Sequence, residues 1–281
     1  MTPFYQKSGI TLYLEDCIEG MTRETAPKTI DVVVTSPPYN IGIKYSYYRD
    51  SRPRADYLKW IGVVGEGVKR ALSDDGSFFL NVGGIPRDPW LPFDIAQTLR
   101  SEFVLQNSFH WIKSIAIMKR DVGGHMGLQA DIAPGHYKPI GGRRFVNDCQ
   151  EYIFHFTKRG DVKLDRLAVG VPYQDKSNIG RWKAKHDVRC RGNTWFIPYQ
   201  TIQDKRLERP HPSTFPVALP EMCMKIHGLD RIERAMDPFI GIGTTALACM
   251  NLKKQCIGFE VDRQYLQEAS LRLNEAGRRR D

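Results

Sequence analysis

The sequence predicts an α/β protein with a doubly wound, mostly parallel sheet, and three observations lead to this fold class. Strand-like runs alternate with segments of helical spacing along most of the 281 residues. The run IDVVV at residues 30–34 is rich in β-branched residues, as in a strand that is covered on both faces of a parallel sheet. Hydrophobic residues make up 41% of the chain, which is enough for a full core at this length.

The first part of the chain supplies two strands and a long helix. ITLYLED, residues 10–16, has the β-branched and aromatic content of a strand, and we expect a short polar helix or turn after it, ending near Lys28. The strand at 30–34 follows. Apolar residues at helical spacing then predict a helix over 56–72, which the sequence SDDG ends.

Three more strands and a helix are expected before residue 160. GSFFLNVGG, residues 76–84, is a strand, and a helix follows over 91–100. Further strands are expected around 103–112 and at EYIFHFTK, residues 151–158. Between these two strands, residues 121–144 contain six glycines and little apolar periodicity, which predicts a mobile surface loop.

The α/β pattern breaks over residues 161–209 and then resumes. Short strands, turns and charged residues in this stretch indicate an inserted module. The proline-rich RPHPSTFP leads into a helix at 220–227. A short strand then precedes Asp237, the small residues after this motif predict a helix, and QCIGFEVD is a further strand.

The composition indicates an intracellular protein without a structural metal. No apolar run reaches the roughly 18 residues that a membrane span needs, and the N-terminus lacks a signal-peptide pattern. The six cysteines are scattered, with neither a C-x-x-C pair nor histidines at zinc spacing, so we expect reduced thiols. We therefore expect a soluble protein with no metal site and no membrane partner.

The positive charge gathers in one quarter of the chain. The net charge of the whole chain is +9, and between Lys138 and Arg209 sixteen Lys and Arg stand against eight Asp and Glu, a net charge of +8. Aromatic residues are interleaved, as in GRWKAKHDVRCRGNTWF, and this mixture suits a surface that contacts phosphates and bases. A solvated basic face is the alternative, and nucleic acid is the favoured partner.

The pentapeptide TSPPY, residues 35–39, directly follows the strand at 30–34. Proline lacks a backbone N–H and fixes φ, so Pro37 and Pro38 end the strand and stiffen the turn. A strand terminator is the simplest interpretation of the pentapeptide. A rigid platform for chemistry is the other.

A second motif, DPFIGIGTT, begins at Asp237 after a short candidate strand. Gly241 and Gly243 permit a tight turn and a close approach of the backbone to a ligand, and the helix that follows presents free N–H groups. The motif lacks the third glycine of the dinucleotide fingerprint and the lysine of a P-loop. About twenty residues further on, Glu260 ends the next strand, where a carboxylate commonly accepts hydrogen bonds from both hydroxyls of a ribose.

Taken together, TSPPY, HPSTFP, DPFIGIGTT and the acid in IGFEVD resemble the motifs of the S-adenosylmethionine-dependent amino-group DNA methyltransferases. TSPPY precedes the glycine motif, with a basic stretch between them, and this order resembles the β group of that family. The resemblance covers nearly the whole chain outside 121–144 and the basic stretch. It implies a Rossmann-like sheet of seven strands in permuted order, S-adenosyl-L-methionine as the cofactor and duplex DNA as the partner.

The resemblance also assigns residues to the two halves of a site. It implies contacts to the adenine, ribose and methionine parts of the cofactor by Asp16, Cys17, Thr35, Thr214, Phe215, Asp237, Phe239, Gly241, Gly243, Thr244 and Glu260. It assigns catalysis to Ser36, Pro37, Pro38 and Tyr39. Where many relatives have GSGT this chain has GIGT, so Ile242 leaves that contact to backbone groups.

The implied chemistry needs hydrogen-bond acceptors at an amino group. The lone pair of an exocyclic amino group is delocalised into its ring, and acceptors at both N–H bonds localise it for attack on a methyl sulfonium. Ser36 Oγ and the Pro37 carbonyl are the expected acceptors, held in place by the proline pair. The base has to leave the duplex to reach them, and Tyr39 is the expected stacking platform. Neither Cys17 nor Cys149 lies in the Pro-Cys context of a C5-cytosine nucleophile, so we expect direct in-line transfer.

The residue before Pro-Pro-Tyr bears on the target base. Serine at this position resembles the cytosine-N4 enzymes, whereas aspartate or asparagine is mostly found with adenine N6. The predicted activity is therefore N4-methylation of cytosine in duplex DNA, of the kind found in restriction-modification, and N6-methylation of adenine is the alternative. A non-catalytic nucleic-acid-binding protein and an RNA or protein methyltransferase are the less favoured alternatives.

The predicted organisation has three parts. Residues 1–160 form the catalytic half, 161–209 the inserted target-recognition region and 210–281 the cofactor-binding half. We expect DNA contacts, mostly to phosphate, from Arg143, Arg144, Lys183, Lys185, Arg189 and Arg191. The residues leave open the recognition sequence, a companion restriction endonuclease and a homodimer. For a bacterial or archaeal enzyme of this family we expect a cytoplasmic location at the nucleoid.

Overall fold

The chain folds around one mixed β-sheet. The computed structural model describes residues 2–43, 45, 47–122, 128–135, 142–181, 186–198 and 214–278. Within these residues the sheet has nine strands in the order β1-β2-β9-β8-β3-β4-β6-β5-β7. The strands are β1 (Tyr5–Lys7), β2 (Ile10–Leu14), β3 (Ile30–Thr35), β4 (Leu72–Val82), β5 (Val104–Ile112), β6 (Gln150–Thr157), β7 (Thr194–Phe196), β8 (Arg234–Asp237) and β9 (Gln255–Glu260).

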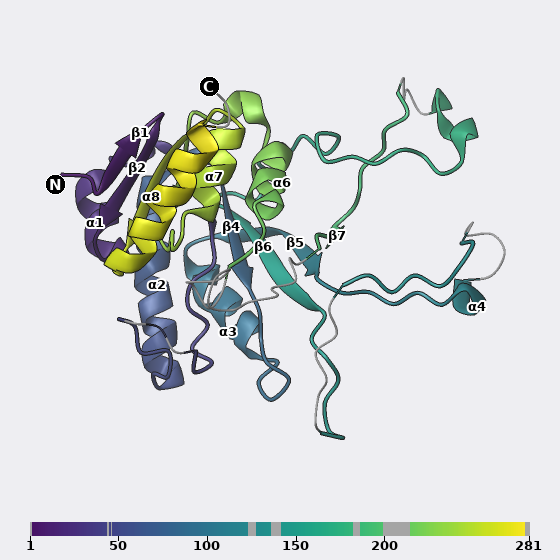
Figure 1. Ribbon diagram of the computed structural model, residues 1–281, viewed down its shortest axis with the longest axis horizontal. Coiled ribbons are helices and arrows are strands. Elements are labelled where there is room, and N and C mark those ends of the chain that lie inside the picture. Colours follow the sequence, from purple (N-terminus) through teal and green to yellow (C-terminus); the bar gives the residue numbers. More distant parts are fainter. Residues whose placement is uncertain are drawn as a thin grey trace.

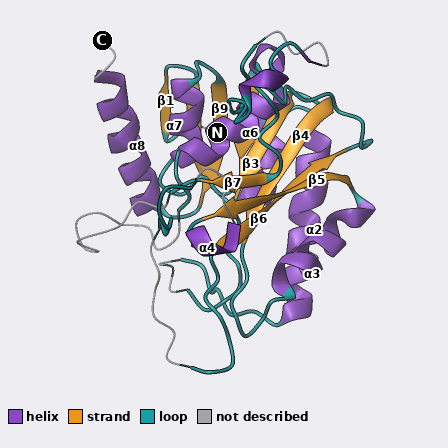
Figure 2. Ribbon diagram, turned by 90° about the vertical axis from the view of Figure 1, so that its right-hand side faces the viewer, coloured by secondary structure: helices purple, strands orange, loops and turns teal. Residues whose placement is uncertain are grey.

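Helices cover both faces of the sheet, so the fold has three layers (Figures 1 and 2). One face carries α6, α7 and α8, and the other carries α1, α2 and α3, while α4 lies away from the sheet. The helices are α1 (Cys17–Glu24), α2 (Arg54–Ala71), α3 (Leu91–Thr98), α4 (Lys119–Val122), α6 (Ala218–His227), α7 (Thr244–Asn251) and α8 (Arg263–Arg278), with 3₁₀ turns η1 (Leu99–Ser101), η3 (Lys176–Asn178) and η5 (Leu229–Arg231).

Strand β3 lies at the centre of this arrangement and is covered on both faces. Val32 and Val34 pack into the cluster under α6, α7 and α8, whereas Val33 packs into the cluster under α1, α2 and α3. All three valines are fully buried. The expected doubly covered strand is confirmed, and the continuous β-branched run follows from burial on both sides.

The central strands place their ends at one edge of the sheet. β2 pairs in parallel with β9, β9 with β8, β8 with β3, and β3 with β4. Neighbouring parallel strands bring their carboxyl ends together, and ligands of such sheets bind outside these ends. Beyond β4, strand β6 runs in the opposite direction, since it is antiparallel to both β4 and β5.

The predicted fold class is confirmed, with two additions at the edges and one long helix. The resemblance implied seven strands, whereas the described residues form nine. The extra edge strands β1 and β7 have three residues each, which is too short for a periodic pattern. Helix α8 was not predicted. Helix α2 ends at Ala71, and the SDDG sequence that follows is part of strand β4, which begins at Leu72. The pairing of β4 with β3 has a register shift in this region.

The basic stretch is joined to the sheet by its last part. β7 pairs in parallel with β5, and Trp195 on β7 is fully buried against Phe109, with ring centroids 4.4 Å apart. Before β7 the chain extends away from the sheet, as does the segment with α4, where Ile117 and Ile132 form a bridge (Figure 1). The predicted loop at 121–144 thus contains a bridge residue and the end of a short helix, and the rest of its described residues are irregular.

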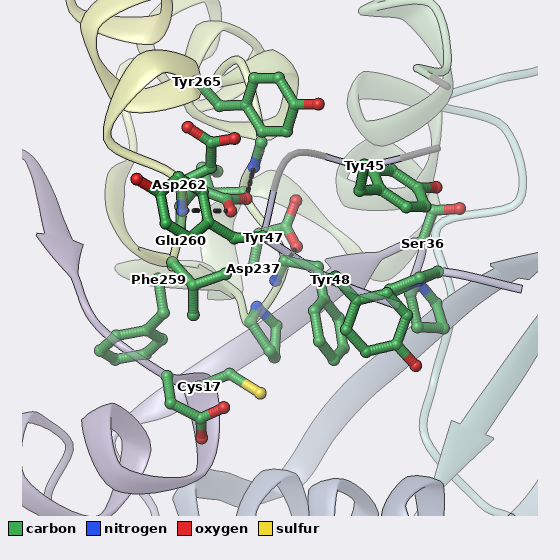
Figure 3. Close-up of a pocket in the computed structure, with 18 of the residues that line it drawn as sticks. Cys17, Ser36, Tyr45, Tyr47, Tyr48, Asp237, Phe259, Glu260, Asp262 and Tyr265 are labelled. Carbon is green, nitrogen blue, oxygen red and sulfur yellow. Dashed lines mark hydrogen bonds between the residues drawn. The ribbon is translucent and has the colours of Figure 1, made fainter. Parts of the chain in front are cut away.

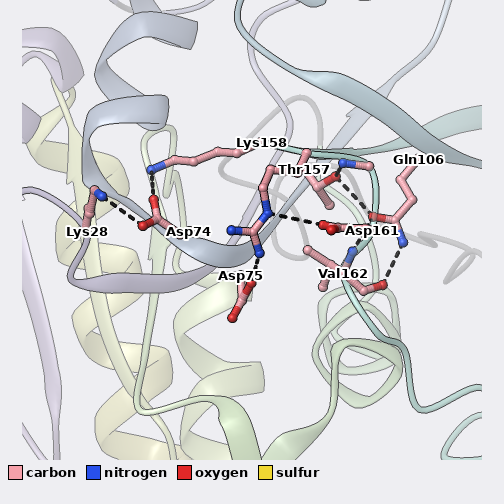
Figure 4. A network of polar contacts seen from close by, with 10 residues as sticks. Lys28, Asp74, Asp75, Gln106, Thr157, Lys158, Asp161 and Val162 are labelled. Carbon is pink, nitrogen blue, oxygen red and sulfur yellow. Dashed lines mark hydrogen bonds and ion pairs between the residues drawn. The ribbon is translucent and has the colours of Figure 1, made fainter.

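A polar network fastens the exit of β6 to the start of β4 (Figure 4). Asp74 accepts from Lys28 Nζ at 2.8 Å and from Lys158 Nζ at 3.4 Å, and Arg159 pairs with Asp75 and Asp161. Its groups are mostly exposed, so each pair contributes little to stability.

A second polar group lies inside the core, between the sheet and α6. Ser77 Oγ lies 2.9 Å from His155 Nε2 and 2.9 Å from His227 Nδ1, and all three residues are buried. Asn107 Nδ2 donates to His155 Nδ1 at 3.0 Å, so His155 carries its proton on Nε2 and donates to Ser77. Burial lowers the pKa of His155 to about 3 and that of His227 to about 4.

These two histidines predict a loss of stability in mild acid. Their folded pKa values lie below the ordinary value of 6.5, so below this pH the unfolded chain binds more protons than the folded one. Between pH 7 and pH 5 the two histidines contribute a fall of roughly 2 to 4 kcal/mol in the free energy of unfolding. Glu260 and Asp237, whose pKa values burial raises to about 7 and about 6, contribute a change of opposite sign over the same range. The histidine contribution is therefore measured as a difference between variants, by urea denaturation at both pH values. Relative to the wild type, His227→Asn, which retains an acceptor for Ser77, should become more stable by roughly 1 to 2 kcal/mol between pH 7 and pH 5, and the exposed control His186→Asn should show no such change. The same pH dependence in His227→Asn and the wild type would contradict the prediction.

No helix in the described ranges combines the length and apolar character of a membrane span. All six cysteines are free thiols, and four of them are buried, namely Cys17, Cys223, Cys249 and Cys256.

Candidate active site

The predicted motifs meet at the carboxyl edge of four adjacent parallel strands. Asp16 follows β2, Glu260 ends β9, Asp237 ends β8 and the TSPPY segment begins at the last residue of β3. Because β2, β9, β8 and β3 are neighbours in the sheet, residues more than 200 positions apart in sequence, such as Thr35 and Asp237, form a hydrogen bond. The order of the strands therefore assembles the site.

A single pocket at this edge joins the two groups of predicted residues (Figure 3). Ser36 lies on one side of the pocket, and Glu260 with Asp262 lies on the other. Twelve of the predicted site residues line it: Asp16, Cys17, Ser36, Pro37, Pro38, Thr214, Phe215, Asp237, Phe239, Gly241, Thr244 and Glu260. Of the HPSTFP motif, His211, Pro212 and Ser213 lie outside the described residues.

Asp237 ties the glycine turn to the TSPPY strand. Its Oδ1 accepts from Thr35 Oγ1 at 2.5 Å and from the backbone N–H of Phe239 at 3.0 Å, and its Oδ2 accepts from Thr245 Oγ1 at 2.6 Å. Burial raises its pKa to about 6, and these hydrogen bonds oppose the rise. Thr35 is buried behind the pocket and holds Asp237, and it is not among the lining residues.

The two glycines of DPFIGIGTT have different structural roles. Gly241 has φ +50° and its N–H donates to Glu260 Oε2 at 3.1 Å, so the turn and the acid are one unit. Gly243 has φ +79° and begins α7, and a Cβ there would lie 3.0 Å from that of Ala269 on α8. Gly243 thus lies behind the pocket, where glycine allows both the left-handed backbone and the close packing of α7 on α8.

Glu260 is a half-buried acid in the lining of the pocket. Its Oε1 accepts from the N–H of Asp262 at 2.9 Å, and its Oε2 accepts from that of Gly241. An ionised carboxylate accepts about four hydrogen bonds, so lone pairs remain for a ligand. Burial raises the pKa of Glu260 to about 7, and the backbone N–H groups lower it in part. The acid therefore titrates near neutral pH.

An aromatic wall closes the pocket on the side that follows TSPPY. Tyr45, Tyr47 and Tyr48 line it together with Trp60 of α2, whose ring centroid lies 5.4 Å from that of Phe239. This wall was not predicted, although the run YSYY after TSPPY was a signal for it. A planar or apolar ligand can pack against such rings.

The segment that carries the wall is fastened by Asp50. Its carboxylate accepts from the backbone N–H groups of Asn40 at 2.6 Å, Ile41 at 3.1 Å and Ile43 at 2.9 Å. Arg52 lies over the ring of Tyr48 at 4.8 Å. Both residues were missed as well, because their partners are set by the path of the loop.

Three residues of the TSPPY segment line the pocket, and the other two, Thr35 and Tyr39, do not. Ser36, Pro37 and Pro38 line the pocket, and Tyr57 Oη donates to the Pro38 carbonyl at 2.8 Å. Tyr39 is only 7% exposed and is not among the lining residues. Its hydroxyl lies 2.8 Å from Ser36 Oγ and 3.0 Å from Glu151 Oε2.

The N-terminal contribution comes from the turn between β2 and α1. Asp16 caps α1 by accepting from Ile18 N at 2.8 Å, and Cys17 lies beside it in the wall of the pocket. Burial and the carboxylate of Asp16 raise the pKa of the Cys17 thiol, so Cys17 is not an activated nucleophile. Phe259 stacks on Tyr13 at 5.8 Å behind it.

The predicted DNA-contacting residues lie outside the pocket. Arg143, Arg144, Arg189 and Arg191 are exposed, and Arg191 Nε donates to the Val169 carbonyl at 2.9 Å. Lys183 and Lys185 lie outside the described residues. The described residues contain no group of three or more His, Cys, Asp or Glu arranged to hold a metal ion.

The pocket suits a ligand with a planar ring, a vicinal diol and a reacting end. Aromatic rings form one wall, the carboxylate of Glu260 faces the interior, and a hydroxyl with two rigid prolines lies at the far side. Such a site can hold a nucleoside-like molecule with one end pointed at Ser36.

Comparisons with known proteins agree with this geometry. A family model described as DNA methylase matches residues 30–271. The type II methyltransferase M.ScaI of Streptomyces caespitosus is 28% identical over 278 residues, covering 96% of this chain and 83% of that protein. Among solved structures, the PvuII DNA methyltransferase, named as cytosine-N4-specific, has a TM-score of 0.67 at 20% identity, covering 96% of this chain and 88% of the other. A protein of Thermus thermophilus solved with S-adenosyl-L-methionine has a TM-score of 0.58 at 20% identity, covering 94% and 93%. Both solved structures are similar to this chain in fold.

Proposed function

The chain belongs to the N6/N4 family of DNA methylases, and from this premise we propose that it transfers a methyl group from S-adenosylmethionine to the N4 amino group of a cytosine in duplex DNA. One observation carries the proposal. A single pocket connects the acid and glycine turn at Glu260 with Ser36 of TSPPY, so a cofactor and a target amino group can meet inside it.

The residues present fit S-adenosylmethionine. Glu260 has lone pairs for the ribose hydroxyls, and the rings of Tyr45, Tyr48 and Phe239 offer apolar surface. When bound, the cofactor supplies an electrophilic methyl group on a sulfonium. The other predicted contacts, from Asp16, Cys17, Thr214, Phe215, Asp237, Gly241 and Thr244, line the same pocket, and their roles are part of the proposal.

Ser36 and Pro37 prepare the target amino group. Their hydroxyl and carbonyl oxygens accept hydrogen bonds from its two N–H bonds, which localises the nitrogen lone pair for attack. The two prolines and the bond from Tyr57 to the Pro38 carbonyl hold the acceptors in place before the base arrives. Groups that are already in position cost no reorganisation during the reaction, which is a large part of catalysis by polar sites.

The cytosine has to be extrahelical, because its amino group is paired inside the duplex. Stacking of the flipped ring on Tyr39 stays a prediction. The side chain is 7% exposed and does not line the pocket, so stacking would require the groups that cover its ring to move. Its hydroxyl is hydrogen-bonded to Ser36 and Glu151.

The target base follows from serine at the first position of S-P-P-Y. The similar fold of a protein named as cytosine-N4-specific supports N4, and adenine N6 is the alternative outcome. Mass spectrometry of nucleosides from plasmid DNA methylated by the protein tests the proposal. N4-methylcytosine is expected, and N6-methyladenine alone would overturn the choice of base. A protein that binds duplex DNA but neither binds the cofactor nor transfers a methyl group would overturn the function.

The division of labour along the chain is part of the same proposal. Residues 1–160 carry the catalytic half, 161–209 the target-recognition region and 210–281 the cofactor-binding half. Duplex DNA is the proposed partner, as for type II methyltransferases. A cytoplasmic location at the nucleoid, where duplex DNA and the cofactor meet, stays a prediction.

Arg189 offers a test of the DNA surface. Its guanidinium is exposed on the segment that extends from the sheet, so Arg189→Ala should weaken DNA binding across sequences and reduce the salt slope of binding by about 1. Arg191→Ala should weaken binding further, because it also removes the bond to Val169. Fluorescence anisotropy over a salt series measures both. Arg159→Ala is the control, since two carboxylates neutralise Arg159. An unchanged slope for Arg189→Ala would exclude a phosphate contact.

A further inference from the structure

A chain of hydrogen bonds leads from Ser36 at the pocket to Glu151 on β6. Ser36 Oγ lies 2.8 Å from Tyr39 Oη, which lies 3.0 Å from Glu151 Oε2. Asn81 Nδ2 donates to Tyr39 Oη at 2.8 Å and to Glu151 Oε2 at 2.7 Å. The other carboxylate oxygen, Glu151 Oε1, accepts from Lys113 Nζ at 2.9 Å. The function proposed above uses Ser36 but leaves Glu151, Asn81 and Lys113 without a role.

The chemistry of these groups sets the direction of each hydrogen bond. A carboxylate only accepts hydrogen bonds, and Glu151 forms an ion pair with Lys113. Tyr39 has one proton and receives a bond from Asn81, so it donates to the charged Glu151, which is both closer and a stronger acceptor than the neutral Asn81 carbonyl at 3.2 Å. The 2.8 Å contact between Ser36 and Tyr39 then needs the Ser36 proton.

The direction matters at the pocket. If Ser36 gives its proton to Tyr39, this proton points away from the pocket and the oxygen lone pairs face the pocket. The amino group of a base needs an acceptor at this place. Without the carboxylate at the end of the chain, Tyr39 can donate to Ser36 instead and the hydroxyl of Ser36 is free to turn toward the base.

The surroundings are shaped to hold Glu151 and Tyr39 together. Asn81 is 1% exposed, Tyr39 7% and the side chain of Glu151 16%. Gly83, just after β4, has no side chain, and a Cβ there would lie 2.9 Å from Glu151 Cγ and 3.3 Å from Tyr39 Cε2. Hydrogen bonds in such a poorly solvated place are stronger than in water. The space left by Gly83 and the strand pairing of β4 with β6 both support the chain of hydrogen bonds.

We propose that Glu151 is a positioning residue, which through Tyr39 keeps Ser36 an acceptor and receives the proton that the methylated amino group releases. The proposal rests on the methyl transfer proposed above. Once the N–CH₃ bond has formed and the methyl–sulfur bond has broken, the nitrogen carries one proton too many. This proton passes to Ser36 Oγ. At the same time the hydroxyl proton of Ser36 passes to Tyr39 Oη, and the hydroxyl proton of Tyr39 passes to Glu151. One N–H bond breaks, one O–H bond forms on Glu151, and the carboxylate becomes a carboxylic acid.

Two substitutions test the proposal through the rate of a single turnover. Glu151→Gln retains the shape but removes the charged acceptor, and Tyr39→Phe retains the ring but removes the hydroxyl. Each should slow methyl transfer to duplex DNA at least tenfold, while the Kd for S-adenosylmethionine and the KM for DNA change less than threefold. The double variant should be no more than threefold slower than the slower single variant, because both break one chain.

Two further variants separate this role from a general loss of stability. Gly83→Ala should also slow the transfer, because its methyl group displaces Glu151 and Tyr39 while leaving their chemistry intact. Glu102→Gln is the matched control, since Lys69 and Glu102 form a similar ion pair, 3.0 Å apart, elsewhere in the protein. It should leave the rate unchanged.

The measured rates of these variants support or overturn the role of Glu151. Wild-type rates in Glu151→Gln overturn the proposal, as does a wild-type rate in Tyr39→Phe beside a slow Glu151→Gln. If Glu151→Gln fails to fold, Tyr39→Phe and Gly83→Ala decide: slow transfer in both supports the proposal, and a wild-type rate in either overturns it. If the wild-type protein itself transfers no methyl group to any duplex DNA, the proposed function has failed instead.

Discussion

Ser36→Ala should lower the single-turnover rate of methyl transfer by about 10² to 10³, the loss commonly seen when one preorganised hydrogen-bonding group is removed from a reacting centre. The variant removes the acceptor for one N–H bond of the target amino group. Binding of the cofactor should change less than twofold, because the predicted contacts around Glu260 lie on the other side of the pocket. Transfer of a labelled methyl group to duplex DNA and calorimetry with S-adenosylmethionine measure the two effects.

The fold should tolerate this change. Tyr39 keeps its bonds to Glu151 and Asn81 when the Ser36 hydroxyl is absent, so no buried group loses all its partners. Ser101→Ala, on an exposed 3₁₀ turn, is the control and should have the wild-type rate. A Ser36→Ala variant that retains more than a third of the wild-type rate would exclude Ser36 as an acceptor in the reaction.

Glu260→Gln should weaken binding of S-adenosylmethionine by roughly 30- to 150-fold, corresponding to about 2 to 3 kcal/mol for a charged hydrogen bond. Gly241 and Asp262 donate to different oxygens of Glu260, so in the amide one of these N–H groups faces an NH₂ donor and the turn also loses support. Calorimetry at pH 8 gives the change in Kd. The control is Glu275→Gln on the exposed side of α8, where we expect no change.

The pH dependence adds a sharper criterion. The raised pKa of Glu260, about 7, means that this acid gains a proton as the pH falls from 8 to 6, and the protonated form accepts fewer hydrogen bonds. Wild-type affinity for the cofactor should therefore fall about tenfold over this range. Asp237 has a pKa of about 6 and titrates later. A flat profile in Glu260→Gln is expected, and a flat profile in the wild type would contradict the role of Glu260.

Much of the fold could be predicted because its central elements carry strong local patterns. The strand at β3 is β-branched throughout, and the helix at α2 has apolar residues at regular helical spacing. Both are confirmed within two residues at either end. Strand β1 was not predicted, and β7 was expected only as one of the unplaced short strands within 161–209, because three residues carry no period. Both are strands through their pairing with β2 and β5. The formation of β1 and β7 therefore depends on strand pairing in the tertiary structure.

The candidate site divides in the same way. Motifs that combine a strand end with glycine, proline or an acid could be located from sequence, since each needs that residue type for its own backbone. The side chains of Tyr45, Tyr48 and Trp60 could not, because their place in the wall depends on how the loop after TSPPY folds over α2. The orientation of Tyr39 was also hidden, since its partners come from β4 and β6.

Local sequence patterns are sufficient to predict the kind of fold, the residues at its strand ends and the family to which they point. These properties follow from local backbone preferences and from short motifs in which each residue type is required. Only the tertiary structure decided which strands are neighbours, and therefore that Ser36, Asp237 and Glu260 share one pocket. It also decided that Glu151, more than 100 residues from Ser36, ends a hydrogen-bond chain at that pocket. The direction of a hydrogen bond depends on what lies at both of its ends, and the sequence order does not contain that information.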